Sequence, residues 1–113
     1  MSAPAGIDET PLDRLREAGG VEFERKIVRL FLEHVPVRLE SARGAAASGD
    51  ADGVRFHAHS LKSSAAQLGA IRMSELCKEA ERRGAEGDVA ASVLDEVKVE
   101  LDSVCAWFRA KLE

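Results

Sequence analysis

The sequence contains no tyrosine, and only 4% of its residues are aromatic. A sheet-rich core is therefore unfavourable, because strands are enriched in aromatic and β-branched residues, whereas Leu, Val and Ala suit packed helices. No apolar run approaches the roughly 20 residues that span a bilayer. Residues 1–6 also lack the basic start and apolar centre of a signal peptide. These absences predict a helical, cytoplasmic protein without a membrane span.

The two cysteines, Cys77 and Cys105, have neither CxxC nor zinc-ligand spacing, and both fall on apolar helical stripes. We expect reduced core residues, as in a cytoplasmic protein. The chain also lacks a nucleotide-binding glycine loop and an acidic metal-binding cluster. Its net charge of −4 argues against a nucleic-acid partner. A chain of 113 residues suits one domain with a single core.

Residues 1–9 are predicted to be a flexible tail. Thr10, a capping residue, precedes Pro11 and starts a short helix that Gly19 and Gly20 stop. Apolar residues at three- and four-residue steps then predict a long helix over residues 21–47, with a kink at the internal Pro36.

Three further helices follow. One begins near residue 50, capped by Asp50 or Asp52, and ends at Gly69. The next covers about residues 72–83, and the last is capped by Asp88 and carries a long apolar seam. Short turns between such helices make neighbours antiparallel. The predicted fold is all-α, an antiparallel four-helix bundle with a short extra N-terminal helix, over residues 10–113.

Residues 55–70 carry the most informative pattern. On a helix, at about 100° per residue, the apolar residues form one stripe and His59 falls on nearly the opposite face. Burial therefore does not explain His59. Arg55 lies one turn before it and Lys62 one turn after it, with small side chains nearby. An imidazole between two cations suits a negatively charged group that is attached or delivered to the ring, whereas a lone surface histidine has no such pattern.

Residues 58–70 read Ala-His-Ser-Leu-Lys-Ser-Ser-Ala-Ala-Gln-Leu-Gly-Ala. They resemble the signature of histidine-containing phosphotransfer (HPt) domains: alanine, histidine, any residue, leucine, lysine, glycine, two serines, variable positions, then glycine and a small residue. The resemblance implies that His59 accepts a phosphoryl group, that Lys62 offsets its charge, and that Gly69 ends the helix. Ser63 departs from the pattern, since the family usually has glycine there.

A neutral ring nitrogen can accept a phosphoryl group near neutral pH, and positioning and charge supply most of the catalysis. Arg55 is a second candidate cation. The resemblance implies that Glu81 bonds the other ring nitrogen and fixes the tautomer; the alternative is a solvated surface charge. The Ser63 hydroxyl either crowds the approach of a partner or donates a hydrogen bond to a phosphoryl oxygen.

The resemblance also implies the partners, which are receiver domains of response regulators and a hybrid histidine kinase. The chain would be a monomeric phosphoryl carrier without ATP-dependent kinase activity and without a cofactor, with Mg²⁺ on the receiver. Partner docking is expected around His59, at Phe56 and Ala66, and at Leu12 and Leu15 of the short helix.

Two other classes of function compete with phosphotransfer. A non-catalytic interaction module with a decayed HPt fold is supported by Ser63. A metal or cofactor bundle would need facing Glu and His ligands, which the sequence does not offer. His57 cannot chelate a metal together with His59, because residues two apart point to different sides of a helix. We interpret His57 as structural, at the core edge, and His34 as facing solvent.

Overall fold

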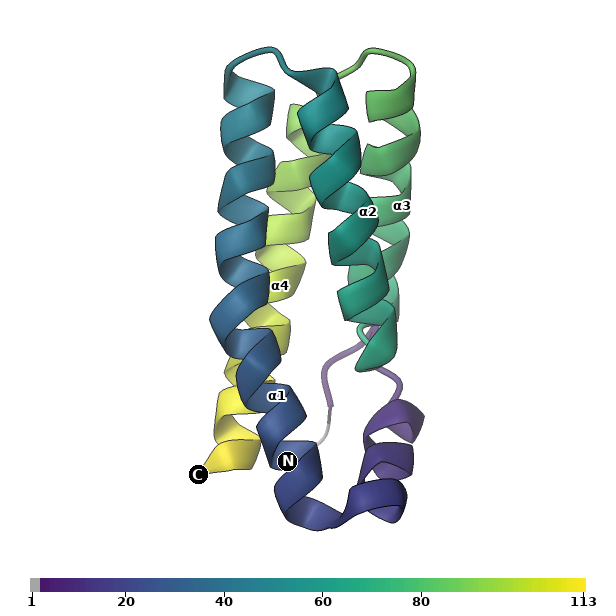
Figure 1. The fold of residues 1–113 in the computed structure, drawn as a ribbon, viewed down its shortest axis with the longest axis vertical. Helices are drawn as coiled ribbons and strands as arrows, with labels where there is room; N and C mark the ends of the chain where they lie inside the picture. The colour runs from purple at the N-terminus through teal and green to yellow at the C-terminus, as the bar shows by residue number, and fades with distance from the viewer. Residues whose placement is uncertain (1–2) are drawn as a thin grey trace.

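The computed structural model describes residues 3–113 and consists of four helices that run alternately up and down (Figure 1). They are α1 (Thr10–Ala47), α2 (Ala51–Gln67), α3 (Ile71–Ala85) and α4 (Ala91–Leu112). The molecule is elongated, with extents of 42 × 22 × 19 Å. The predicted all-α, antiparallel four-helix bundle is confirmed. Within residues 3–113, none of the helices combines the length and apolarity needed to cross a bilayer.

Helix α1 consists of two pieces that meet at Gly20. Its φ of 84° and ψ of 178° are non-helical, and the chain reverses direction there (Figure 1). This left-handed φ favours glycine, which has no Cβ. Arg16 in the short piece donates to Glu24 in the long piece through Nε (3.3 Å) and Nη2 (2.8 Å). Glu24 is only 6% exposed, so this pairing compensates a buried charge. The short piece is the predicted extra helix, and α1 continues through Pro36 without non-helical backbone.

Aspartates accept backbone N–H groups near the starts of α1, α2 and α4, but only at α2 is the aspartate itself the N-cap residue. Asp50 accepts from the backbone N–H three residues on at 2.9 Å, as predicted for the start of α2. The expectation that Asp88 caps α4 is wrong, because the N-cap is Ala90; Asp88 instead accepts from the N–H of Ala90 at 2.9 Å, just before the helix. The expectation that Thr10 caps α1 is wrong, because Thr10 is already helical and its N–H donates to Asp8 Oδ1 at 2.9 Å. An aspartate accepts such a bond as well as threonine does.

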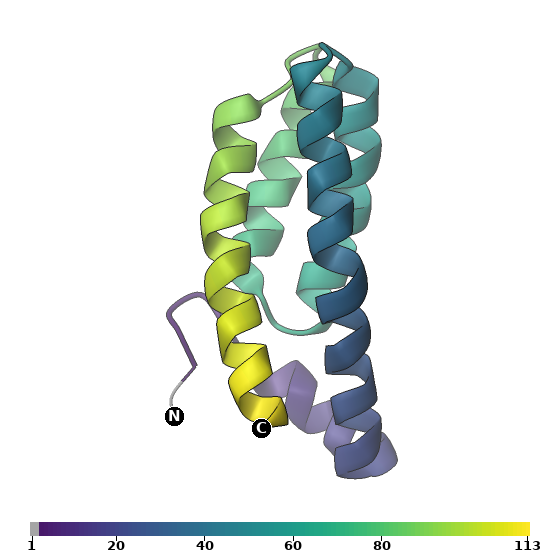
Figure 2. The ribbon, with the colours of Figure 1, turned by 90° about the vertical axis from the view of Figure 1, so that its left-hand side faces the viewer.

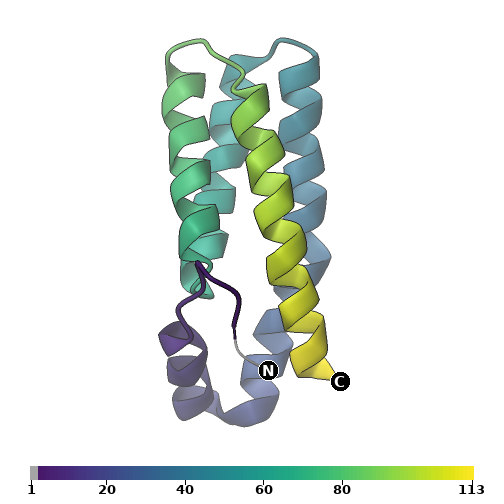
Figure 3. The ribbon, with the colours of Figure 1, turned by 180° about the vertical axis from the view of Figure 1, so that it is seen from behind.

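Residues 3–9, which we call the N-terminal strap, are attached to the turn between α2 and α3 (Figure 3). The N–H of Asp8 donates to the Gly69 carbonyl at 2.8 Å, and the N–H of Ile71 donates to the Gly6 carbonyl at 2.9 Å. The predicted flexible tail therefore differs from the structure over these residues; the first two residues of that tail lie outside the described part. The boundaries of the domain itself stay a prediction.

The core lies between the four helices, and α4 packs against α1 and α3, diagonally across the bundle from α2 (Figure 2). Phe31 and Phe108 meet edge to face, with ring centroids 5.1 Å apart, a favoured geometry for aromatic pairs. Cys77 and Cys105 are buried free thiols, as predicted. Burial raises the pKa of the Cys77 thiol to about 12, so this thiol stays protonated and unreactive in the folded protein.

Candidate functional site

Small residues let α2 and α3 approach closely. Ala58 on α2 and Ala80 on α3 are completely buried. A Cβ on Gly84 of α3 would lie 2.9 Å from the Ala51 carbonyl oxygen and 3.0 Å from the backbone nitrogen of Arg55. A larger residue at position 84 would therefore push the two helices apart. This close approach brings the outward edge of α3 within reach of the side chains on α2.

Glu81 on α3 joins both of the principal site residues on α2. Its Oε2 lies 2.6 Å from His59 Nδ1, and its Oε1 accepts from Lys62 Nζ at 2.7 Å. The His59 side chain is 65% exposed, whereas that of Glu81 is 23% exposed. The carboxylate is thus partly buried under a ring whose far edge faces solvent. Three of the residues that the sequence analysis assigned to the site are thus brought together, with Glu81 contacting both His59 and Lys62.

The protonation of this cluster follows from its contacts. The pKa of the Glu81 carboxyl is lowered, chiefly by the hydrogen bond from Lys62; burial opposes this shift, and the bond from His59 adds to it. An ionised carboxylate only accepts hydrogen bonds, so His59 Nδ1 must carry a proton. In the neutral ring the lone pair then belongs to Nε2, on the opposite edge of the imidazole.

A hollow of about 390 Å³ lies beside the exposed ring. Arg55 borders it and has a long ion pair of 3.9 Å with the exposed Asp52, one turn further from His59. Phe56 is 63% exposed, which is unusual for a phenylalanine. The hollow spans three helices: it is lined by Arg38 of α1, by Arg55, Phe56, His59 and Ser60 of α2, and by Glu81 of α3.

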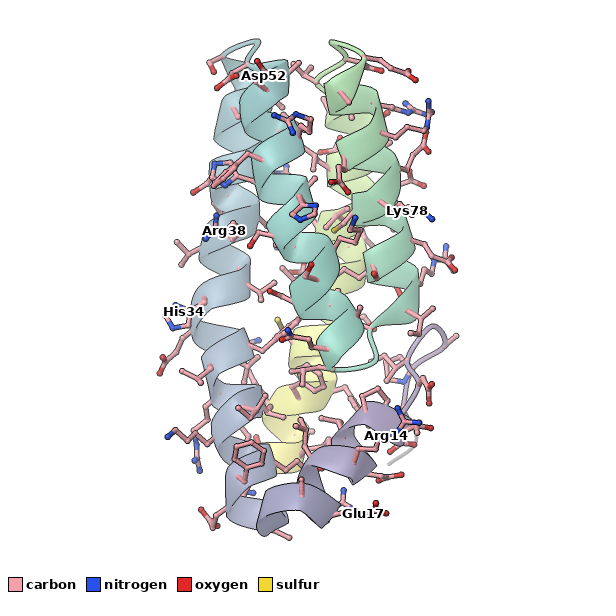
Figure 4. The ribbon with its side chains drawn as sticks, turned by 45° about the vertical axis from the view of Figure 1, so that its right-hand side comes forward. Arg14, Glu17, His34, Arg38, Asp52 and Lys78 are labelled. Carbon is pink, nitrogen blue, oxygen red and sulfur yellow. The ribbon has the colours of Figure 1, made fainter. Side chains whose placement is uncertain are left out.

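Arg38 and Ser60 are the lining residues that the sequence analysis missed, and of the two only Arg38 comes from another helix than His59. Arg38 lies on α1, beside the middle of α2 and on the opposite side from Lys78 of α3 (Figure 4). Periodicity places a residue on a face of its own helix but does not reveal which residue of a neighbouring helix lies opposite. Its cationic type alone could not have distinguished Arg38 from the other arginines of α1.

The remaining predicted site residues differ in position. Ser63 and Ala66 are exposed one to two turns beyond His59, and Ser63 Oγ donates to the His59 carbonyl at a long 3.4 Å. Leu12 is 1% exposed and belongs to the core, and Leu15 packs against that core. Their segment, which carries Arg14 and Glu17, lies at the end of the bundle away from Asp52 (Figure 4). Leu12 is therefore corrected from a docking residue to a core residue.

The described residues 3–113 contain no group of three His, Cys, Asp or Glu side chains that could hold a metal ion. Of the two other histidines, His34 is exposed on α1, and His57 is half-buried with its Nδ1 3.3 Å from Arg38 Nη1. Both positions agree with the structural interpretation. The chemical resources of the site are therefore one exposed nucleophilic nitrogen, one carboxylate behind it, and several cations around it.

Comparisons with known proteins agree with this geometry. The family model of the Hpt domain matches residues 26–107. Among solved structures, histidine-containing phosphotransfer protein B (HptB) from Pseudomonas aeruginosa PAO1 has a TM-score of 0.90 and 27% sequence identity, over 97% of this chain and 96% of that chain. No match was found among curated proteins. Since the family model covers well over half of the chain, the protein belongs to the Hpt domain family, whose members act in histidine phosphotransfer in phosphorelays.

Proposed function

We propose that His59 is the phosphoryl acceptor and that the chain relays a phosphoryl group between receiver-domain aspartates, or from a hybrid histidine kinase to a response regulator. One observation carries this proposal. The imidazole is exposed, while its Nδ1 is bonded to the partly buried Glu81. The second nitrogen, Nε2, is thereby left with a lone pair on the solvent side. A histidine that served only the surface would not need a charged residue from another helix to orient it.

The proposed transfer balances without a further reactant. The Nε2 lone pair attacks the phosphorus of an aspartyl phosphate, the P–N bond forms, and the bond from phosphorus to the aspartate oxygen breaks. The aspartate leaves as a carboxylate and keeps the bonding electron pair. The ring, now carrying phosphorus on Nε2 and a proton on Nδ1, becomes cationic, and the Glu81 carboxylate 2.6 Å away stabilises that charge. Attack by another aspartate on the same phosphorus reverses these steps.

The cations of the site stabilise the negative charge of the phosphoryl group. Lys62 holds Glu81 ionised through its 2.7 Å bond and places its ammonium beside the ring that receives the phosphoryl group. Arg55 adds positive charge from the previous turn. The Ser63 hydroxyl can exchange its long bond to the His59 carbonyl for a phosphoryl oxygen. The Mg²⁺ used in phosphoryl transfer would belong to the receiver domain, and the carrier would act as a monomer.

The decisive test is phosphorylation of the parent protein and of His59→Gln by a phosphorylated receiver domain. The parent should acquire an acid-labile, alkali-stable phosphoryl group, and His59→Gln should acquire none. His34→Gln is the matched control, since it changes an exposed histidine of α1. His59→Gln should keep the parent's circular dichroism and thermal midpoint, because the side chain is exposed.

The same experiment examines the alternative, a non-catalytic interaction module. In that case a receiver would bind the chain, yet neither the parent nor the control would become phosphorylated. Label that persists on His59→Gln would instead refute the assignment of the acceptor.

A further inference from the structure

Arg38 connects α1 to the part of α2 that precedes His59. Its Nη1 lies 3.3 Å from His57 Nδ1, and its guanidinium carbon lies 6.0 Å from the centroid of the Phe56 ring. The rings of Phe56 and His57 themselves meet edge to face at 5.3 Å. Arg38 also lines the hollow that contains His59. The exposed Phe56 is thus held from one side by a cation of another helix.

The bond to His57 has a defined direction. A guanidinium only donates hydrogen bonds, so His57 Nδ1 accepts, and in the neutral ring the His57 proton lies on Nε2. The tautomer of His57 is therefore opposite to that of His59, whose Nδ1 bears the proton. Arg38 uses one of its five N–H donors on this imidazole, and no carboxylate of residues 3–113 lies within ion-pair distance of its guanidinium.

This lack of compensation sets Arg38 apart. Among the half-buried arginines of residues 3–113, it is the one that bonds neither a carboxylate nor a backbone carbonyl. The chain contains 20 acidic residues and has a net charge of −4, so acidic partners are abundant. The other half-buried arginines all have an oxygen acceptor: Arg25 bonds the carbonyls of Lys111 and Leu112, Arg43 pairs with Asp95, and Arg83 pairs with Glu79.

We infer that Arg38 is a specificity-determining docking residue, whose guanidinium binds an acidic side chain on the receiver domain that presents its aspartyl phosphate to His59. This inference rests on the proposed function. A partner that delivers a phosphoryl group from an aspartate brings negative charge to the hollow, and a planar guanidinium pairs with a carboxylate through two hydrogen bonds. Phe56 beside it supplies apolar contact area at the same surface.

The variants Arg38→Gln and Arg38→Lys test this role against a matched control. Glutamine removes the charge but retains an amide that can donate to His57, and lysine keeps the charge but lacks the planar fork. The control is Arg29→Gln, which removes the same charge from the same helix. Nine residues correspond to about 180° around a helix, so Arg29 and Arg38 lie on opposite faces of α1. Arg29 is exposed and outside the hollow.

The measurement is phosphotransfer from an isolated, phosphorylated receiver domain, chosen as the fastest donor among the receivers of the source organism. At low ionic strength, Arg38→Gln should raise the half-saturating receiver concentration about fivefold to tenfold, while the maximal rate changes less than about twofold. Arg38→Lys should fall between this variant and the parent. Arg29→Gln should match the parent. The difference in half-saturating receiver concentration between Arg38→Gln and the parent should shrink at about 0.5 M salt, where the Debye length is only a few ångströms.

Two outcomes would overturn the inference: equal half-saturating concentrations for Arg38→Gln and Arg29→Gln, or a loss confined to the maximal rate. Thermal midpoints and the His57 nitrogen shifts in NMR identify a variant that has lost the α1–α2 contact. The first of these outcomes refutes the inference even where Arg38→Gln has lost the His57 bond.

Failure of the proposed function gives a different result. Phosphoramidate, a small phosphoryl donor that needs no docking, should label His59 equally in the parent and in Arg38→Gln. If the parent accepts no phosphoryl group from either donor, the proposed function is refuted. Calorimetric binding of the unphosphorylated receiver to the parent, to Arg38→Gln and to Arg29→Gln still decides whether Arg38 is a docking residue.

Discussion

Replacing Glu81 separates two effects of its side chain on His59. Glu81→Gln removes the charge but keeps an oxygen that can accept from Nδ1, and Glu81→Ala removes both. Hydrogen bonds to charged groups contribute about 1.5–3 kcal/mol. The His59 side chain is 65% exposed, so solvent screening places this contact at the lower end of that range. A loss of about 1.5–2 kcal/mol in the transition state corresponds to a rate reduction of roughly 10- to 30-fold for Glu81→Ala.

Glu81→Gln should slow transfer less, by roughly twofold to fivefold, because a neutral hydrogen bond of about 1 kcal/mol remains. The assay is the single-turnover transfer rate from a saturating phosphorylated receiver. ¹⁵N NMR reports the His59 tautomer in parallel, and the Nδ1–H form should become less populated in Glu81→Ala. Glu79→Gln is the control, since Glu79 lies two residues earlier on α3 and pairs with Arg82 and Arg83 instead.

The pH dependence of stability provides a second test. Because the pKa of Glu81 is lowered below its ordinary 4.5 in the folded state, its contribution to stability is present above that value and is lost as the pH falls through the lowered pKa. The stability difference between the parent and Glu81→Ala should therefore diminish in acid. Parent-like transfer by Glu81→Ala, with an unchanged His59 tautomer, would refute the proposed orienting role.

Lys62→Ala should slow transfer by roughly 10- to 100-fold with little change in thermal midpoint; an unchanged rate with a cognate receiver would show that other cations carry the charge. Ser63→Gly and Ser63→Ala should both slow transfer if the hydroxyl bonds a phosphoryl oxygen, and rates equal to or above the parent would disprove that bond. Gly69→Ala should lower the free energy of unfolding by about 2–4 kcal/mol, because its φ is +81° and the new Cβ would lie 1.9 Å from the Asp8 carbonyl oxygen. The control is Gly49→Ala, where φ is +76° but the space around the new Cβ is open. Chemical denaturation should show that its free energy of unfolding falls by only about 1–2 kcal/mol, and equal losses in the two variants would contradict the clash. Cys77 should resist iodoacetamide in the native protein and react after unfolding, as mass spectrometry would reveal; prompt native labelling would contradict its raised pKa.

Side-chain periodicity was sufficient to predict the helices, because each buries one stripe and the stripe is visible in the sequence. The sequence also predicted an aspartate cap for the histidine helix but left Asp50 and Asp52 as alternatives, and in the structure Asp50 is the N-cap. The strap was not predictable in this way. Its hydrogen bonds join backbone groups of Gly6 and Asp8 to Ile71 and Gly69, and backbone pairing leaves little trace in residue type.

Site residues on the same helix could be predicted from the sequence, whereas those on neighbouring helices could not be predicted from periodicity alone. His59 and Lys62 lie one turn apart on one helix, so helical geometry alone brought them together. Glu81 required the family resemblance, because it comes from α3. Arg38 required the register of α1 against α2. Leu12 was correctly placed on a short apolar helix, but whether such a helix exposes or buries its leucine depends on the packing of the whole bundle.

The strap has a consequence for the order in which the molecule folds. Its pairing with the α2–α3 turn closes a loop of about 60 residues, and such closure costs more conformational entropy than forming a helical hairpin. The pairing of α2 with α3, which builds the histidine cluster, needs only the short turn between them. We therefore expect the cluster to assemble early and the strap to dock last. In native-state hydrogen exchange, the amides of Asp8 and Ile71 would then open at lower free energy than those of α2, so the beginning of the chain could detach while His59 stays in place.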